Sequence, residues 1–181
     1  MSTMSTMSPD GGPPTVDVPS PHWRPRTRAV DRLVVHAMAE WVLDDGLAYH
    51  CTDYLRRVEL STHAFCLPDG RLVRAVDPEV AAFHAGPHND RSVGIEVVVA
   101  GVHDLDGLVR RMDDLAEAPY TEAQYAAAGW WLRRQADRWG LGFGHVTTHA
   151  ALDPARKRDP GRAFDIDRLR AAFESAGTGR A

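Results

Sequence analysis

Apolar and polar positions along the chain follow two different periodicities, and the short apolar runs predict the strands of a buried sheet. The segment Ser92–Ala100 is apolar almost throughout, which is typical of a central strand covered on both faces. Leu33–His36 is a shorter run of the same kind. Ser61–Leu67 and Leu72–Val76 flank the turn signal Pro68-Asp69-Gly70, so they predict a hairpin. A further short strand is expected at residues 145–148.

Helical patterns occupy other parts of the chain. Thr121-Glu-Ala-Gln124 is a capping box, and the spacing of apolar residues behind it predicts a helix that ends at Gly140. Asp165 is expected to cap a last helix, in which Ile166, Leu169 and Phe173 face inward.

Two regions are less regular. Asp44 and Asp45 are expected to cap a helix that continues to about Arg57 and turns Leu47 inward. Residues 101–120 are polar and charged, and a surface loop is expected there. Together the elements predict a mixed α/β (α+β) fold, with a single central mixed β-sheet flanked by helices.

Composition limits the organisation to one domain. The chain has 181 residues, of which 44% are hydrophobic, enough for one well-filled core. Ser, Thr, Gly and Pro dominate the start, so residues 1–16 are expected to be a disordered tail. The domain is expected to span residues 17–176, with 177–181 as a flexible C-terminus. Val18–His22 is expected to be an extended arm that lies on the domain.

Charge and hydropathy exclude several classes of partner. The formal net charge is −4, so no nucleic acid partner is expected. No apolar stretch approaches the roughly 20 residues that a membrane span requires. The N-terminus lacks the basic and hydrophobic regions of a signal peptide, which favours a cytoplasmic location. Cys51 and Cys66 form no CxxC pair and are expected to be small buried hydrophobes rather than a disulfide.

Three residues suggest a metal centre: His36 and His149, each at or next to a predicted strand, and Asp159 in the loop that follows. Two imidazoles and one carboxylate are a common ligand set for a catalytic zinc that keeps its fourth position open. Each residue alone is more often structural, because a single histidine at a strand end is usually a plain core or surface residue. Pro160 and Gly161 fix a tight turn just after the carboxylate.

Charged residues near these three fit a hydrolytic site. Lys157 lies two positions before Asp159, so its ammonium is expected to point into the same cleft and stabilise an oxyanion. The alternative is a solvated charge run, Arg156–Arg158. Glu96 interrupts an apolar strand, and a buried carboxyl with a raised pKa suits a general base. The alternative is a structural salt bridge. Gly94, on the same face as Glu96, is expected to leave room there for substrate or water.

Five motifs in order resemble the zinc-dependent N-acetylmuramoyl-L-alanine amidases of the amidase-2 type. This family is related to peptidoglycan recognition proteins, and its AmpD-like members are closest in pattern. The likeness covers roughly residues 17–175. The motifs are Leu-Val-Val-His36, Ser-Thr-His63-Ala-Phe-Cys-Leu-Pro-Asp-Gly, Ala-Phe-His84-Ala-Gly, Asn89-Asp-Arg-Ser-Val-Gly-Ile-Glu96 and His149-(x)9-Asp159-Pro-Gly.

The resemblance implies that His36, His149 and Asp159 hold zinc, that Glu96 is the catalytic carboxylate, and that Lys157 stabilises the tetrahedral intermediate. It implies cleavage of the amide between the lactyl group of N-acetylmuramic acid and L-alanine of the stem peptide, with a muropeptide or peptidoglycan as substrate. Residues of the binding loops and the groove rim are expected to contact that substrate, namely Trp41, His63, His84, Asn89, Arg158 and Arg162.

Several alternatives stay open. A non-catalytic muropeptide receptor of the same fold is one, although such relatives typically lack a metal ligand. An unrelated domain with accidental histidines is another. The motifs do not separate recycled anhydro-muropeptides from intact cell wall as substrate. A phage lysin that reaches the wall through a holin is the alternative to a cytoplasmic enzyme. A monomer is expected for a groove enzyme of this size.

Overall fold

The computed structural model describes residues 11–177, and the expectations for residues 1–10 and 178–181 fall outside that range. Within it, a seven-stranded mixed sheet has the order β1-β6-β5-β8-β3-β4, with β9 also pairing with β3, and a small second sheet joins β2 and β7. The strands are β1 Thr15–Asp17, β2 Trp23–Pro25, β3 Arg32–Asp44, β4 Leu47–His50, β5 Ala64–Cys66, β6 Leu72–Arg74, β7 Val80–Ala82, β8 Ser92–His103 and β9 Val146–Thr148.

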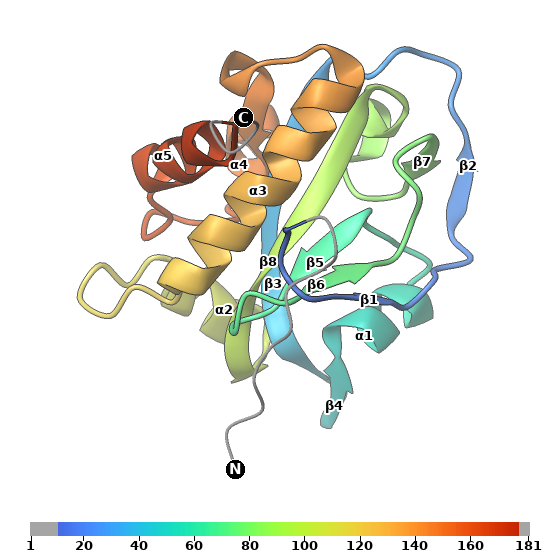
Figure 1. The fold of residues 1–181 in the computed structure, drawn as a ribbon. Coiled ribbons are helices and arrows are strands. Elements are labelled where there is room, and N and C mark those ends of the chain that lie inside the picture. Colours follow the sequence, from blue (N-terminus) through green and yellow to red (C-terminus); the bar gives the residue numbers. More distant parts are fainter. Residues whose placement is uncertain (1–10, 178–181) are drawn as a thin grey trace.

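The helices are α1 Cys51–Arg57, α2 Leu105–Met112, α3 Glu122–Trp139, α4 His149–Leu152 and α5 Ile166–Gly177, with short 3-10 turns at Gly86–Arg91 and Phe143–His145. They lie on both sides of the sheet, with α3 and α5 packed together against one face (Figure 1). The predicted mixed α/β architecture, a central mixed sheet with flanking helices, is therefore confirmed.

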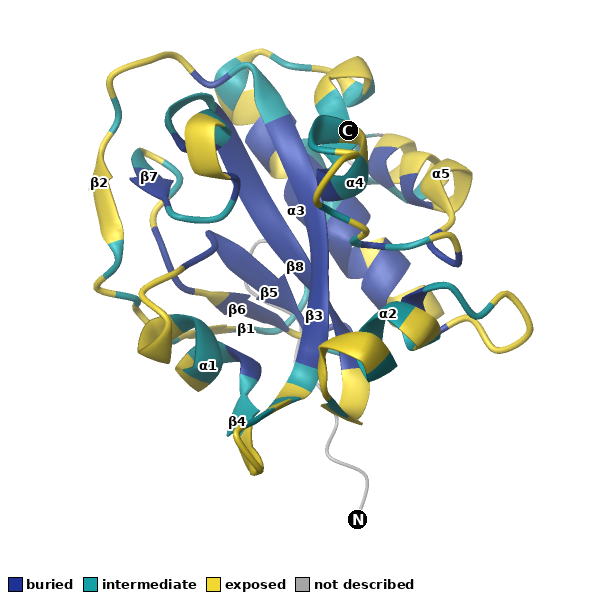
Figure 2. Ribbon diagram, turned by 180° about the vertical axis from the view of Figure 1, so that it is seen from behind, coloured by how far each residue is buried: buried dark blue, intermediate teal, exposed yellow. Residues whose placement is uncertain are grey.

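The long strands β3 and β8 form the buried centre of the sheet (Figure 2). They run parallel, and their register sets His36 opposite Glu96. Runs of β-branched residues explain why both strands suit a position covered on two sides. Because successive side chains alternate between faces, Val35 points to the α3 side while Val34 and His36 point to the other.

The two faces have separate cores. On the α3 side, alternate residues of β3 and β8 pack against α3 and α5. On the opposite side a smaller cluster joins Met38, Phe65 and Val98 with Cys51 of α1. Cys51 and Cys66 are buried free thiols, which confirms their expected role as small hydrophobes. No helix in residues 11–177 is long and apolar enough to cross a membrane.

The predicted capping box fixes the start of α3. The hydroxyl of Thr121 accepts the backbone N–H of Gln124, and the side-chain oxygen Oε1 of Gln124 accepts the backbone N–H of Thr121. The Gln124 amide nitrogen also donates to the backbone oxygens of Cys66 and Val98, which ties the helix to the sheet. Gly140 ends the helix in the left-handed conformation, as expected.

The predicted helix over residues 44–57 is wrong in its first half. Asp45 and Gly46 adopt φ of 49° and 73°, and this left-handed pair forms a tight turn that sends the chain back as β4. Turns of this hand match the twist of a hairpin, so the Asp-Gly pair acts as a hairpin signal rather than as a cap. Leu47 is consequently 59% exposed instead of facing inward, and only α1 is helical.

Three smaller expectations also need correction. Residues 101–120 contain α2, which begins at the cap Asp104 and places Leu108, Val109 and Met112 against the core at helical spacing, a pattern hidden by the charged residues between and after them. Thr15 and Val16, assigned to the disordered tail, pair with β6 as part of β1. Ile166 is 37% exposed, although Asp165 does cap α5 through the N–H groups of Asp167 and Arg168.

The predicted hairpin and the predicted arm agree with the structure. Ser61–Leu67 and Leu72–Val76 contain the antiparallel pair β5 and β6. The arm at residues 18–22 lies along the β6 side of the domain, where the N–H groups of Val18 and Ser20 donate to the backbone oxygens of Arg74 and Ala75.

Candidate metal centre

Three side chains from separate elements converge on one point. Nδ1 of His36 lies 2.9 Å from Nδ1 of His149 and 3.2 Å from Oδ2 of Asp159, and the last two atoms are 3.0 Å apart. Ligand atoms bound tetrahedrally at about 2.0–2.1 Å from a zinc ion are roughly 3.3 Å apart. The triangle is therefore slightly tighter than a zinc site, and a small outward movement of each side chain would make it fit.

Each of the three side chains is held by its own element. His36 lies in the first half of β3, opposite Glu96 of β8 and directly after the residues that pair with β9. His149 is the first residue of α4, where the Thr148 hydroxyl accepts the N–H of Ala151. The loop that carries Asp159 returns to the same helix, because the N–H of Ala150 donates to the backbone oxygen of Asp159 at 2.9 Å.

The electrostatics favour the forms that bind a metal. Burial lowers the pKa of His36, although Asp159 opposes this, so the imidazole stays neutral. Burial raises the pKa of Asp159, but its close contacts with the imidazoles of His149 and His36 outweigh it and leave this pKa below its ordinary value. A metal requires deprotonated ligands, and these residues supply a neutral imidazole and a carboxylate without further change.

Glu96 lies beside this cluster as the β8 partner of His36. Its side chain is 8% exposed, and Oε2 is buried without a hydrogen-bond partner. Burial raises the pKa of Glu96 well above its ordinary value, the Asp159 charge raises it further, and Lys157 opposes both. No salt bridge holds this carboxyl within residues 11–177, so the structural alternative considered above lacks its partner.

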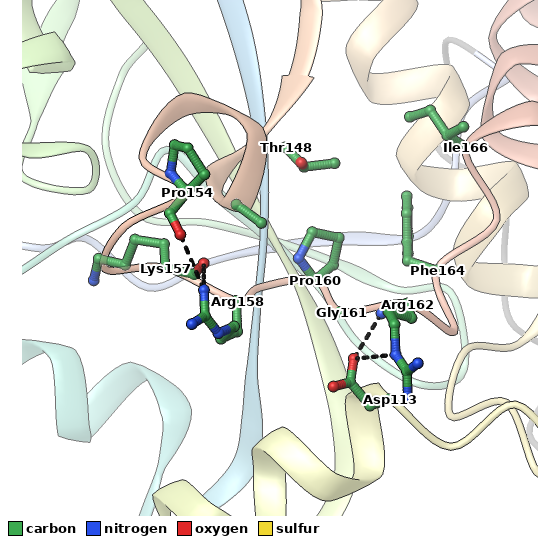
Figure 3. A pocket seen from close by; sticks show the side chains of 11 residues that line it. Asp113, Thr148, Pro154, Lys157, Arg158, Pro160, Gly161, Arg162, Phe164 and Ile166 are labelled. Carbon is green, nitrogen blue, oxygen red and sulfur yellow. Dashed lines mark hydrogen bonds and ion pairs between the residues drawn. The ribbon is translucent and has the colours of Figure 1, made fainter.

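Lys157 and both predicted rim arginines line a pocket of about 470 Å³ beside the ligand loop (Figure 3). Its floor is apolar and includes Pro160 and Phe164. Arg162 faces Asp113 there, while Arg158 donates to the backbone oxygens of Pro154 and Lys157 (Figure 3).

Acidic neighbours partly neutralise the arginines around this loop. Arg156 pairs with Asp153, and Arg162 with Asp113, so two of the positive charges have acidic partners in the structure.

Three of the predicted substrate-contact residues have hydrogen-bond partners within the protein, and their contact with substrate stays a prediction. His63 is buried, and its ring nitrogens face the N–H of Gly94 and the backbone oxygen of Val80. The side-chain oxygen of Asn89 accepts the N–H groups of His84 and Ala85, so it shapes the loop.

His84 itself contacts His36 and Ser92 through its two ring nitrogens. A Cβ at Gly94 would lie 2.4 Å from the His84 ring, so this imidazole, and not substrate, fills the space that the glycine leaves.

Trp41 lies further along β3 than the ligand and packs edge to face on His50. It is 41% exposed and is not a member of the ligand cluster. Strand β3 continues for eight residues beyond His36, so Trp41 is carried away from the metal end of the strand.

Sequence reasoning missed two residues that support the site. The guanidinium of Arg26 donates to the backbone oxygens of Pro78, Asn89, Asp90 and Ser92, and burial lowers its pKa to about 10. The second is Ser92, the first residue of β8, whose hydroxyl oxygen lies within hydrogen-bond distance of Nε2 of His84. Neither position carries a sequence signal, because a single arginine or serine beside an apolar run is common.

A converging His-His-Asp cluster beside a buried, unpaired carboxyl is the arrangement of a mononuclear metal-dependent hydrolase. The profile of the family described as N-acetylmuramoyl-L-alanine amidase, Amidase_2, matches residues 26–162. The chain belongs to this family of amidases, which confirms the family and the activity class expected from the motifs.

Individual relatives agree with this assignment. The chain is 31% identical to the 1,6-anhydro-N-acetylmuramyl-L-alanine amidase AmpD of Salmonella typhimurium strain LT2 over 178 residues, which cover 85% of this chain and 87% of that protein. The same identity holds for AmpD of Escherichia coli K12, with 84% and 88% covered. A crystal structure of a selenomethionine derivative of AmpD superposes with a TM-score of 0.65 and 27% identity, covering 86% of this chain and 92% of that one.

Proposed function

We propose that this amidase is a zinc enzyme that hydrolyses the amide between 1,6-anhydro-N-acetylmuramic acid and L-alanine of a soluble muropeptide. The observation that carries the catalytic part is the convergence of His36, His149 and Asp159 next to the unpaired carboxyl of Glu96. The substrate part rests on the relatives, whose printed name specifies the anhydro sugar.

Zinc fits the donor set, since two imidazole nitrogens and one carboxylate oxygen are its usual ligands in hydrolases. In such sites a zinc ion polarises a carbonyl and acidifies water. His36, His149 and Asp159 would hold it. Because the three residues come from different elements, they would occupy three ligand positions and leave the fourth open for substrate and water.

Glu96 acts as the general base in this proposal. Its buried carboxyl takes a proton from the attacking water as the new C–O bond forms at the lactyl carbonyl carbon. The same proton passes to the nitrogen of L-alanine as the C–N bond breaks. The raised pKa of Glu96 suits both transfers, because a base must bind the proton long enough to deliver it.

Lys157 lines the pocket beside the loop that carries Asp159. Its ammonium would stabilise the oxygen that becomes negative when water adds to the carbonyl. Arg158 lies on the pocket beside it and offers a charge for the carboxylates of the stem peptide. Arg162, paired with Asp113, contributes less. A monomeric state, a cytoplasmic location and the domain limits 17–176 stay predictions.

A parallel digestion tests the substrate. The zinc-loaded protein is incubated with a soluble anhydro-muropeptide and with purified sacculi, and released stem peptide is measured in both. Fast release from the soluble compound with little from sacculi supports the proposal. Preferential digestion of sacculi would reassign the enzyme to wall degradation, and absence of release from either would favour the non-catalytic receptor.

A further inference from the structure

A line of hydrogen bonds leads away from the candidate metal centre, through residues that the amidase reaction does not use directly. Nε2 of His36 lies 2.8 Å from Nδ1 of His84. Nε2 of His84 lies 3.1 Å from Oγ of Ser92. The Ser92 hydroxyl donates to the backbone oxygen of His88 at 2.7 Å. The line thus ends at the backbone oxygen of His88, which has no proton to donate.

Because the last group is an acceptor, it determines which atom donates the proton in every hydrogen bond of the line. A carbonyl oxygen can only accept, so the single hydroxyl proton of Ser92 is used at His88. The Ser92 oxygen must then accept from Nε2–H of His84. A neutral imidazole carries one N–H, so Nδ1 of His84 has a lone pair and accepts from Nε2–H of His36. By the same count, Nδ1 of His36 has its lone pair free.

This lone pair faces the other two ligands. Nδ1 is the atom of His36 that lies 2.9 Å from His149 and 3.2 Å from Asp159. With the opposite tautomer, the ring would present an N–H to the metal and could not bind it. The hydrogen bond that Ser92 donates to His88 therefore determines, through His84, whether Nδ1 of His36 can bind a metal.

Several contacts hold the ring of His84 in place, so that its Nδ1 stays directed at His36 and its Nε2 at Ser92. Its backbone N–H donates to the Asn89 side chain at 3.1 Å. The ring lies against Gly94, where any Cβ would overlap it, and edge to face with the ring of His63 at 5.3 Å. Arg26 fastens the backbone of the same turn at Asn89 and Ser92.

We propose that His84 is a positioning residue, oriented by Ser92, that locks His36 in the tautomer whose Nδ1 binds the metal. The inference relies on the proposed function only for the identity of the metal, zinc. Outer partners of this kind typically change metal affinity or activity by about 10- to 100-fold when they are removed.

Two substitutions of nearly equal shape separate the acceptor from the packing. His84→Asn retains an oxygen close to the position of Nδ1, whereas His84→Leu retains the volume without an acceptor. His103→Leu, at a partly exposed histidine at the opposite end of β8 from Ser92, is the control. Each variant is first compared with the wild type by urea unfolding, so that a loss of fold is recognised.

Zinc affinity is measured by competition with a chromophoric chelator. We expect His84→Leu to weaken zinc binding by about 10- to 100-fold, His84→Asn to restore most of the loss, and His103→Leu to bind as the wild type does. Equal affinity in the wild type and His84→Leu would overturn the inference. So would an equal loss in both His84 variants, because the acceptor would then be irrelevant.

The tautomer is read independently from the nitrogen chemical shifts of the ring by long-range proton–nitrogen NMR, on the full chain with and without zinc. We expect His36 to carry its proton on Nε2 in both states of the wild type. A proton on Nδ1 of His36 without zinc would overturn the inference. If the expected tautomer and zinc affinity are found but no muropeptide is cleaved, the proposed function fails and the inference stands.

Discussion

Replacing Glu96 by glutamine tests the proposed base without changing the shape of the site. Glutamine fills nearly the same space but cannot accept a proton at neutral pH. The three candidate ligands are not altered, so zinc content should match that of the wild type. Loss of a general base typically costs about 10²- to 10⁴-fold in rate, equivalent to roughly 3 to 5 kcal/mol in the barrier.

The same substitution should make the protein more stable. Glu96 is 8% exposed and has an oxygen without a partner. Leaving a buried polar group unpaired costs on the order of 1–3 kcal/mol, and more when the group is charged, so removal of the charge should raise Tm at roughly 2–4 °C per kcal/mol gained. Glutamine keeps a polar group, so the gain comes from the charge that it lacks.

The pH dependence of this gain has a definite sign. The pKa of Glu96 in the folded protein is raised above its unfolded value, so the folded state binds the proton more tightly. As pH rises from the unfolded pKa toward the folded one, the wild type loses stability and Glu96→Gln does not. The difference in unfolding free energy between the two should therefore be small near pH 4 and larger at pH 8.

Two measurements decide the outcome. Muropeptide hydrolysis is followed by the release of stem peptide, and stability is followed by urea unfolding of metal-free protein at both pH values. If Glu96→Gln keeps its activity within tenfold of the wild type, Glu96 is not the base. If the stability difference is the same at pH 4 and pH 8, the carboxyl is not desolvated as its burial indicates.

Three further predictions concern other parts of the molecule. A chelator should abolish hydrolysis and added zinc should restore it, whereas His149→Ala should lose both metal and activity; a metal-free but active variant would contradict the site. Lys157→Met should lower kcat by about 10²- to 10³-fold at unchanged zinc content, whereas Arg158→Met should mainly raise KM, and equal falls in kcat would refute the distinct role of the lysine. Gln124→Leu should cost about 3 kcal/mol in urea unfolding, because three hydrogen bonds of about 1 kcal/mol each are lost; a cost below 1 kcal/mol would show that the amide does not tie helix to sheet.

The sequence predicted those elements whose signals are local. The apolar run around Ile95 can only be a buried strand, and the Thr121 capping box begins a helix wherever it is followed by apolar residues at helical spacing. The Asp45-Gly46 turn was misassigned because an acidic residue before a helical pattern has two meanings, a helix cap or a hairpin turn. Which one applies depends on whether β3 continues past His36, and that is decided by pairing with β8.

The candidate ligands were predictable because their residue types are specific to metals and their motifs occur in order. The environment of the ligands was not. His84 and Asn89 look like binding residues in the sequence, since polar side chains in a glycine-containing loop usually face solvent. In the structure His84 contacts His36 and Ser92, and Asn89 binds the backbone of its own loop. Arg26, more than fifty residues earlier, holds this loop through the backbone oxygens of Asn89 and Asp90. Such long-range contacts leave no trace in local spacing.

The bond between Ala150 and Asp159 has a consequence for how this enzyme can diversify. It joins the two ends of the segment that begins at His149 and ends at Asp159, so the residues between them form a loop with fixed ends. Substitutions at Arg156 or Arg158 can then change the charge beside the pocket without displacing either ligand or Lys157, which lies between these arginines. The preference among substrates can therefore be changed within this short segment while the proposed catalytic groups are retained.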